Sequence, residues 1–371
     1  MNPSSPIPVR PADAADYAVH VEGLDALPAR MAEGGVRVGR TLVITDETVG
    51  ALYLDRVVSL IRTGGGHAEA HVLPPGEATK SPAHLAALYD WALGLGIDRQ
   101  TPVVALGGGV VGDLAGFAAA TLLRGLPLVH VPTSLIAQVD SSIGGKTGIN
   151  HAVGKNLVGA FHQPAVVLAD PSVLRTLAPR DLRSGLAEAV KHALIADAAF
   201  ADALAASWDA LVAAEVDALG PMVHRAASIK AQIVSADVRE QGERALLNFG
   251  HTFGHALERE AGYGTLTHGE AVAIGMRAAL HLSASLRAGR DAGGALPAPF
   301  RSAAALVDRI DPPAVDPALS VRQLTEAMAS DKKRDAGGLR FVVLDAVGRA
   351  RIAEGVPRPL VEAAWAFALR R

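Results

Sequence analysis

The first 130 residues alternate short apolar runs with amphipathic stretches, and this alternation limits the folds open to the chain. We predict strands at 41–46, 67–73, 101–109 and 127–132. We predict helices between them, at about 52–61, 82–93 and 110–123. Repeated alternation of strand and helix is typical of a Rossmann-like α/β domain, a parallel sheet with helices on both faces. Such sheets bind ligands at the carboxyl ends of their strands.

Glycines follow the third predicted strand, where Gly107 to Gly112 reads GGGVVG. The spacing fits G-x-G-x-x-G, so backbone amides and a helix N-terminus could hold a pyrophosphate. Glycine-rich turns also serve close packing, and no acid follows about 20 residues later, where the usual ribose ligand stands. Asp46, at the end of the first predicted strand, could supply that acid. We therefore expect a nicotinamide dinucleotide bound in a variant geometry.

From about Thr176 the sequence becomes helical and rich in Ala and Leu, which predicts an α-helical second domain. A chain of 371 residues is long for one core, so we expect domains at 1–178 and 179–371. The proline-containing segment 296–320 is interpreted as a connector between late helices.

Composition excludes several classes of function. Hydrophobic residues make up 50% of the chain and the formal net charge is -3, which argues against a nucleic-acid partner. The absence of cysteine removes disulfides, thiol nucleophiles and thiolate metal sites. No apolar run approaches membrane-spanning length, and the N-terminus lacks the apolar core of a signal peptide. We expect a cytoplasmic enzyme without a membrane partner.

The segment from Arg244 to Glu270 gathers three histidines with Asn248 and Arg244. His251 and His255 are four residues apart in a predicted helix, so both could face one metal ion, with His268 closing the cluster. The alternative is that one histidine caps a helix, one packs in the core and one is solvated.

Charged residues elsewhere point to the same chemistry. Only seven of the 35 basic residues are lysine, and three of these, Lys146, Lys155 and Lys191, stand beside glycine, asparagine or histidine. Glu188 is flanked by Ala187 and Ala189, a setting in which a carboxylate favours a metal or another cation as its partner. A half-exposed Glu188 paired with a nearby Arg or Lys is the alternative.

The chain resembles the 3-dehydroquinate synthases in a series of motifs: GGGVVGDLAGF, VPTSLIAQVDSSIGGKTGIN, GKNLVGAFHQP, SGLAEAVKHALI, LLNFGHTFGHALE, HGEAVAIGM and SDKK. The similarity runs from about residue 40 to 350. It implies a homodimeric carbon–oxygen lyase of the shikimate pathway, which leads to chorismate and aromatic amino acids. The substrate would be 3-deoxy-D-arabino-heptulosonate 7-phosphate. The steps would be transient NAD-dependent oxidation, phosphate elimination, reduction, ring opening and an intramolecular aldol closure.

The resemblance also implies a site in the cleft between an NAD-binding and a metal-binding domain. Glu188, His251 and His268 would bind one divalent ion, zinc or cobalt, which leaves His255 for proton transfer. Other catalytic residues would be Lys146, Lys191, Lys230, Arg244 and Asn248. Substrate would also contact Asp140, Asn156, Arg124, and Lys332 or Lys333. NAD would contact Asp46, Pro75, Gly76, Glu77, Ala78, Thr79, Lys80, Gly108, Gly109, Val110, Val111, Gly112, Asp113, Thr133, Ser134, Lys146, Lys155, Val173, Leu174, Arg175 and Thr176.

Two departures and three alternatives accompany this assignment. His162 and His192 stand where many relatives carry Tyr, and we interpret both as packing or supporting groups. Another sugar phosphate cyclase would share the NAD and metal machinery, and a metal-dependent polyol dehydrogenase would release NADH. A non-catalytic dinucleotide-binding regulator gives no reason for three candidate metal ligands.

Overall fold

The computed structural model describes residues 5–240, 242–262, 264–332 and 339–370, without the side chains of 329–332. It divides into two compact units, Met1–Leu177 with Ala214–Val238, and Ala178–Ala213 with Arg239–Arg371. The predicted domains divide the chain once, after residue 178, whereas in the structure Ala214–Val238 returns to the first unit. This segment contains helix α7 (Val216–Ala236), whose apolar face packs against β1 (Ile7–Val9) and β2 (Tyr17–Val21).

The first unit is built on a seven-stranded sheet in the order β1-β2-β9-β6-β5-β3-β4. The predicted strands are β3 (Arg40–Asp46), β4 (His67–Leu73), β5 (Val103–Gly107) and β6 (Leu128–Pro132). Sequence analysis missed β1, β2 and β9 (Val166–Ala169). Every neighbouring pair except β1 and β2 is parallel, which confirms the predicted α/β class.

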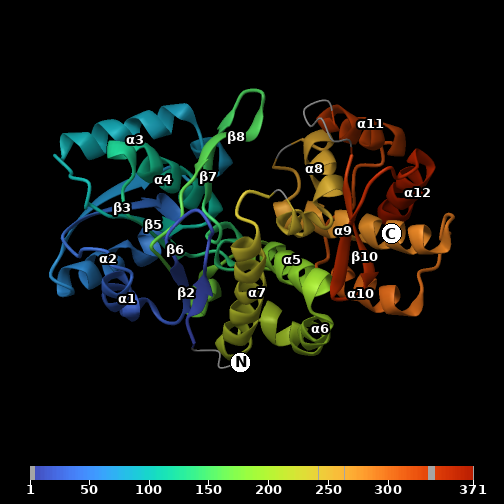
Figure 1. Ribbon diagram of the computed structural model, residues 1–371, viewed down its shortest axis with the longest axis horizontal. Helices are drawn as coiled ribbons and strands as arrows, with labels where there is room; N and C mark the ends of the chain where they lie inside the picture. The colour runs from blue at the N-terminus through green and yellow to red at the C-terminus, as the bar shows by residue number, and fades with distance from the viewer. Residues whose placement is uncertain (1–4, 241, 263, 333–338, 371) are drawn as a thin grey trace. The chain divides into compact units, whose positions relative to one another are not determined.

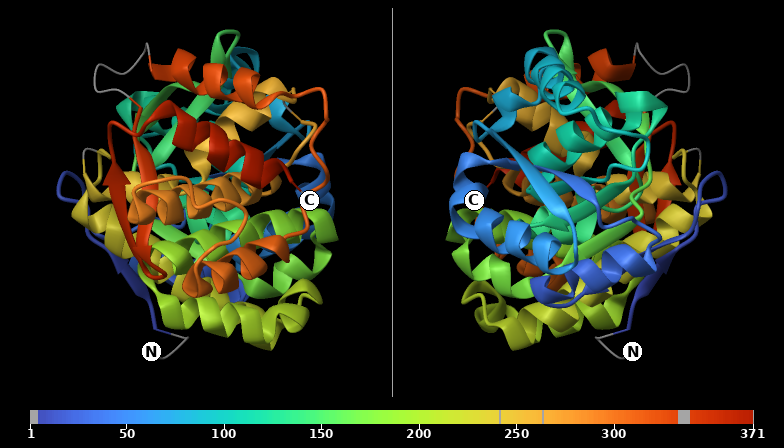
Figure 2. Two further views of the ribbon diagram at one scale, coloured as in Figure 1. Left: turned by 90° about the vertical axis from the view of Figure 1, so that its right-hand side faces the viewer. Right: turned by 90° about the vertical axis from the view of Figure 1, so that its left-hand side faces the viewer.

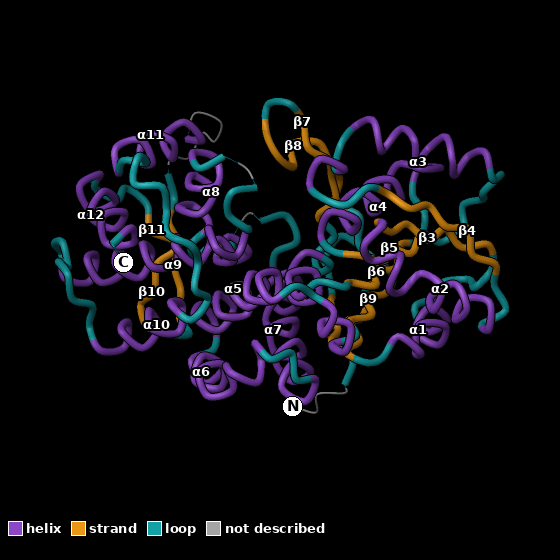
Figure 3. The backbone as a smooth tube through the Cα atoms, turned by 180° about the vertical axis from the view of Figure 1, so that it is seen from behind, coloured by secondary structure: helices purple, strands orange, loops and turns teal. Residues whose placement is uncertain are grey.

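Helices cover both faces of this sheet (Figures 1 and 3). Helices α1 (Leu27–Glu33) and α2 (Glu47–Thr63) pack on one face, and α3 (Pro82–Gly94) and α4 (Gly109–Thr121) on the other. Strand β5 shows how its sequence fits two buried faces. Val103 and Ala105 face α3 and α4, while Val104 and Leu106 face α1 and α2. A continuous apolar run is what a strand buried on both sides requires.

A hairpin that sequence analysis did not predict projects from the first unit (Figure 1). It consists of β7 (Lys146–His151) and β8 (Gly154–Phe161). Gly159 lies so close to the opposite strand that a Cβ there would be 2.1 Å from the Thr147 carbonyl oxygen. Apolar side chains remain exposed along the hairpin, at Val153, Leu157, Val158 and Phe161.

The second unit is mainly helical, as predicted. Its helices are α5 (Pro179–Ala196), α6 (Ala198–Val212), α8 (His251–Glu260), α9 (His268–Ala288), α10 (Ala298–Asp308), α11 (Val321–Lys332) and α12 (Arg358–Leu369). Helix α10 lies within the predicted connector 296–320, so that interpretation was wrong there. The unit also contains an unpredicted hairpin of β10 (Phe341–Ala346) and β11 (Arg349–Ala353), which packs against α9 (Figure 2, left).

Helix α9 is the centre of this unit, because α5, α8, α10 and α12 all pack against it. Glycines permit the closest of these contacts. A Cβ at Gly269 would lie 1.9 Å from the Ser184 carbonyl oxygen on α5, and one at Gly275 would lie 2.0 Å from the Gly250 carbonyl oxygen. Both obstacles are backbone atoms, so neighbouring side chains cannot move aside to relieve the clash. Glycine therefore sets how closely α5 and α8 approach α9.

We expect Gly275→Ala to lower the free energy of unfolding by about 3 kcal/mol, at the upper end of overpacking effects, because its methyl group must displace backbone. Urea denaturation measures this change. Gly294→Ala is the control, since a Cβ there meets no atom within 4 Å, and it should stay within about 0.5 kcal/mol of the parent. Equal stability of the two variants would contradict the close approach of α8 and α9.

Candidate functional site

The predicted cofactor segments gather at one edge of the sheet in the first unit. Asp46 ends β3, Pro75–Lys80 follows β4, and Gly108–Asp113 follows β5. Thr133 and Ser134 follow β6, and Val173–Thr176 follows β9. Since these strands are parallel, their carboxyl ends lie at one edge. This edge is where open α/β sheets bind ligands.

The glycine turn serves close packing at Gly107 and begins helix α4 at Gly108. Gly107 serves close packing, because a Cβ there would lie 2.7 Å from the Val111 Cβ. Gly108 is the N-cap of α4 and has no side-chain capping bond, and a Cβ at this position would meet the Ser134 hydroxyl oxygen at 3.3 Å. The turn therefore lies against the residues after β6, with the first amides of α4 beside it. Amides at a helix N-terminus suit a phosphate.

Asp46 already has a partner in the structure. Its carboxylate caps α2 by accepting a hydrogen bond from the Val49 amide at 3.0 Å. Tyr53, about two turns after Asp46 on α2, was not singled out by sequence analysis. Its hydroxyl donates to the Val173 carbonyl at 3.2 Å and lies 2.6 Å from the Thr176 hydroxyl. Tyr53 thus joins α2 to the 3₁₀ helix η5 (Pro171–Thr176), another predicted cofactor segment.

Lys80, which ends the PGEATK segment after helix η2 (Glu77–Thr79), is buried and draws predicted cofactor and substrate residues together. Its ammonium donates to the Asp113 carboxylate at 2.6 Å and to the Asn156 side-chain oxygen. Burial raises the pKa of Asp113, although the charge of Lys80 acts in the opposite direction. Asn156 has a left-handed backbone, with φ of 56°. Its neighbour Lys155 lies on the same strand, β8.

The remaining predicted substrate residues of the first unit lie in two places. Lys230, buried on α7, donates to Asp140 at 2.5 Å, and Asp140 belongs to the short π-helix η4 (Ala137–Ser141). Lys146 is exposed at the start of β7. Arg124 ends the 3₁₀ helix η3 (Leu122–Arg124), in the connection that enters β6 at its amino end. The structure therefore does not bring Arg124 to the edge that carries the cofactor segments.

In the second unit, Glu188 lies at the centre of a cluster of candidate metal ligands. Its side chain is 0% exposed on α5. Its Oε1 is 3.6 Å from Nε2 of His251 on α8 and 3.4 Å from Nε2 of His268 on α9. Its other oxygen contacts the ammonium of Lys191, one turn along the same helix. One carboxylate oxygen thus faces both imidazoles, and the other faces a fixed cation.

The two imidazoles have different electrostatic surroundings. Burial, reinforced by the charge of Lys191, lowers the pKa of His251 well below its ordinary value. Burial also lowers the pKa of His268, but hydrogen bonds with Glu188 and Glu258 outweigh this effect and raise it to about 10. The Nδ1–H of His251 donates to the Phe249 carbonyl at 3.3 Å, which leaves Nε2 directed toward Glu188. His251 is therefore a neutral donor, and His268 holds a proton that a metal ion would displace.

His255 lies on the exposed side of this cluster. Its ring centroid is 5.4 Å from that of His251 and 6.0 Å from that of His268. Glu188, His251 and His268 form one group of candidate metal ligands whose donor atoms lie close together. His255, Glu258 and His268 form a second such group. The helix predicted for the HxxxH segment is confirmed as α8. The two histidines of that segment do not face Glu188 together.

Two further predicted residues precede α8. Arg244 is 2% exposed, an unusual position for a guanidinium, and belongs to the 3₁₀ helix η6 (Glu243–Asn248). Asn248 ends that helix, and its amide group donates to the Glu240 carboxylate at 2.6 Å. Glu240 was not singled out from the sequence. Lys333 and the side chain of Lys332 lie outside the described residues.

The N-terminus of α9 is held in place by side chains that sequence analysis passed over. Thr267 and Glu270 form a capping box, a signal that the T-x-x-E spacing of TLTHGE carries. Arg180 holds Glu270 through two hydrogen bonds of 2.7 Å. The Gly269 amide donates to the Ser184 hydroxyl at 3.0 Å, one turn before Glu188. These contacts fix His268 relative to α5.

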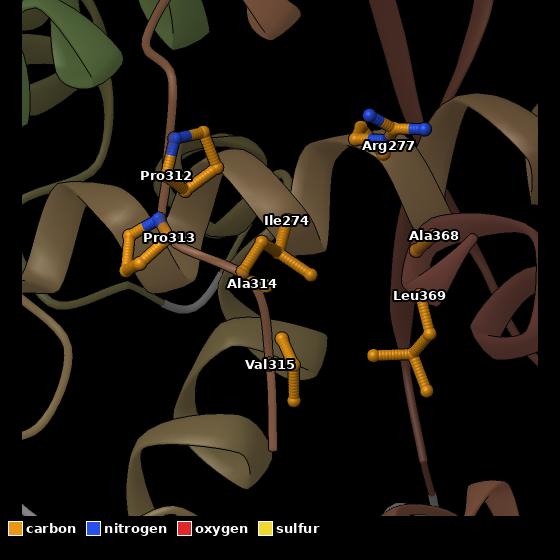
Figure 4. Close-up of a pocket in the computed structure, with 8 residues that line it drawn as sticks. All are labelled: Ile274, Arg277, Pro312, Pro313, Ala314, Val315, Ala368 and Leu369. Carbon is orange, nitrogen blue, oxygen red and sulfur yellow. The ribbon is translucent and has the colours of Figure 1, made fainter. Parts of the chain in front are cut away.

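One pocket of the second unit lies apart from this cluster (Figure 4). It is lined by Ile274, Arg277, Pro312, Pro313, Ala314, Val315, Ala368 and Leu369, none of which is a predicted site residue. Within the described residues, no helix combines the length and apolarity needed to span a membrane.

Solved structures similar to this chain share its fold across nearly its whole length. The 2-epi-5-epi-valiolone synthase from Streptomyces hygroscopicus subsp. jinggangensis, solved with NAD⁺ and Zn²⁺ bound, is 30% identical with a TM-score of 0.85, covering 97% of this chain and 98% of its own. An iron-containing alcohol dehydrogenase, at 15% identity and a TM-score of 0.66, covers 95% of this chain and 97% of its own and shares the fold alone.

Relatives found by sequence have a higher identity to this chain than these solved structures. The 3-dehydroquinate synthase of Salinibacter ruber is 50% identical over 96% of this chain and 95% of its own length, and that of Ruegeria pomeroyi is 47% identical over 90% and 92%. Residues 70–184 match the 3-dehydroquinate synthase N-terminal family, and residues 185–334 match the C-terminal family. The chain belongs to the 3-dehydroquinate synthase family.

Proposed function

We propose that the chain converts 3-deoxy-D-arabino-heptulosonate 7-phosphate into 3-dehydroquinate and phosphate. The observation that carries this proposal is the buried Glu188 oxygen that faces both His251 and His268, in a chain 50% identical to a 3-dehydroquinate synthase. A site of two imidazoles and one carboxylate leaves coordination positions open for substrate oxygens.

The donor geometry fits one divalent ion such as zinc or cobalt. Zinc bonds of 2.0–2.1 Å in a tetrahedron place neighbouring ligand atoms about 3.3 Å apart. The Glu188 oxygen lies 3.4 Å and 3.6 Å from the two Nε2 atoms. The contact of the second oxygen with Lys191 favours a carboxylate that binds through one atom. A bound ion would supply a Lewis acid for the developing alkoxide of the substrate.

The carboxyl edge of the sheet fits NAD. Gly108 and Gly109 add no side chain around the first amides of α4, and a Cβ at Gly109 would meet the Ser141 hydroxyl oxygen at 3.2 Å. NAD, when bound, would supply a hydride acceptor that returns the hydride later in the same turnover. We assign the segments after β3, β4, β5, β6 and β9 to its binding, and thus the first unit to the cofactor.

We assign the substrate's anionic groups to cationic side chains. Lys230, Lys191 and Arg244 are buried cations, and an Arg can hold a carboxylate through two bonds. Asp140 holds the Lys230 ammonium, and Glu240 holds the amide of Asn248. Lys146 and Asn156 would contribute from the hairpin, and Lys332 or Lys333 would add a further cation.

His255 is assigned to proton transfer. It is exposed and lies beside both histidine ligands, so it can exchange protons with solvent and with substrate held at the metal. An imidazole suits this task because its ordinary pKa lies near neutrality.

The protein also acts as a cytoplasmic homodimer in this proposal. The β7–β8 hairpin leaves the apolar Val153, Leu157, Val158 and Phe161 exposed, and side chains of this kind can be covered by a second copy.

The overall reaction is tested with purified protein, the heptulosonate phosphate, a divalent metal and a catalytic amount of NAD⁺. We expect one phosphate released for each substrate consumed, without accumulation of NADH, because the hydride returns to the substrate. Phosphate release and NADH absorbance are followed together. Stoichiometric NADH from simple polyols would instead establish a dehydrogenase, and turnover of other sugar phosphates alone would indicate a related cyclase.

The division of roles among the histidines is tested by His268→Ala and His255→Ala. The first variant should lose stoichiometric zinc together with turnover, because it removes a ligand. The second should retain zinc while kcat falls by about 10²–10⁴, the range for a lost general acid or base. Metal analysis after dialysis and steady-state kinetics provide the two measurements. Equal loss of zinc from both variants would contradict the assignment.

A further inference from the structure

Glu258, on helix α8, contacts His268 of the candidate metal site on the side opposite Glu188. It lies one turn after His255 on α8, and its side chain is 10% exposed. Its Oε2 is 3.4 Å from Nδ1 of His268, whose other nitrogen, Nε2, is 3.4 Å from Glu188. The imidazole of His268 thus lies between two buried carboxylates, one at each nitrogen.

We propose that Glu258 is a positioning residue that fixes the ring orientation and tautomer of His268 for metal binding. Its carboxylate accepts the Nδ1–H hydrogen bond, so the proton that a metal ion displaces is the one on Nε2, beside the Glu188 oxygen. Histidine ligands commonly donate their second ring N–H to a carboxylate or a backbone carbonyl, which also makes the imidazole a stronger donor. This inference rests on the metal site of the proposed function.

His251 offers an internal comparison. Its Nδ1–H donates to the backbone carbonyl of Phe249 at 3.3 Å, so the main chain orients this ligand. The Nδ1–H of His268 instead donates to the side chain of Glu258, which a substitution can replace. The effect of the acceptor on metal affinity can therefore be measured at His268 without altering the backbone.

A competing interpretation makes Glu258 itself a metal ligand. The donor atoms of His255, Glu258 and His268 lie within 4.8 Å of one another. An ion held there together with one at Glu188 would require His268 to bind both ions as a doubly deprotonated, bridging imidazolate. A hydrogen bond to Glu258 needs only the neutral imidazole, which is the form that a metal ligand takes. The structure therefore favours the positioning role.

The test uses the full chain with Glu258→Leu and Glu258→Gln. Leucine fills the space but accepts no hydrogen bond, and glutamine keeps an acceptor oxygen without the charge. Glu260→Gln is the matched control, since Glu260 is an exposed residue on the same helix that contacts Arg259. The Kd for zinc is measured by competition with a chromophoric chelator. The melting temperature of each metal-free variant shows whether the fold is retained.

We expect the Kd for zinc to rise about 10–100-fold in Glu258→Leu, the usual cost of losing such a partner, and at least about threefold in Glu258→Gln. The control should stay within about twofold of the parent. If Glu258 only stabilised the fold, the melting temperatures of the metal-free variants would fall in the order in which their Kd values for zinc rise. We expect no such relation between melting temperature and Kd. Cobalt-loaded Glu258→Gln should keep the parental visible absorption bands, because the ligand set is unchanged.

Three results would overturn the proposal. The first is a Kd for zinc within about twofold of the parent in Glu258→Leu. If Glu258→Leu does not fold, a Kd for zinc within about twofold of the parent in Glu258→Gln overturns the proposal instead. The second is a parent that binds two zinc ions and loses one in Glu258→Gln, which would make Glu258 a ligand. The third is a parent that binds no zinc, which would contradict the proposed metal site as well.

Discussion

The burial of the Glu188 carboxylate is the constraint on which the second unit depends. A carboxylate without solvent exposure costs on the order of several kcal/mol unless cations and hydrogen-bond donors surround it. Lys191 neutralises one oxygen from the same helix, and His251 and His268 approach the other from two different helices. The pKa of His268 is raised for the same reason, because Glu188 and Glu258 stabilise its protonated form. A divalent ion can satisfy this demand for positive charge better than a single proton.

Such a cluster works only if three helices stay close together, and glycine makes this possible. Gly269 lets α9 touch the backbone of α5 one turn from Glu188, and Gly275 lets it touch the residue before His251. The capping box at Thr267 and the Arg180–Glu270 pair then fix the end of α9 that carries His268. Packing and chemistry are therefore encoded together in the motifs NFGHTFGHALE and HGEAVAIGM.

Sequence reasoning succeeded where local patterns determine structure. Strands β5 and β6 are mostly apolar runs bounded by proline or glycine, and α8 carries an apolar face around its histidines. It failed at α10, because Pro299 stands in the first turn, where helices tolerate proline, although the residues that follow are helical. It also missed the β7–β8 hairpin, whose exposed apolar residues and glycines give no clear alternation. The spacing of HxxxH could not show which histidine faces Glu188, because that depends on how α8 is rotated against α5 and α9. Glu258 was missed for the same reason.

We propose that Glu188, His251 and His268 bind one metal ion and that His255 does not. X-ray absorption at the zinc edge of the full chain, loaded with one equivalent of zinc and free of substrate, tests this most directly. We expect two imidazole nitrogens at about 2.0–2.1 Å, with the remaining ligands oxygen atoms at about 2.0–2.2 Å. Three imidazoles in the first coordination sphere would contradict it.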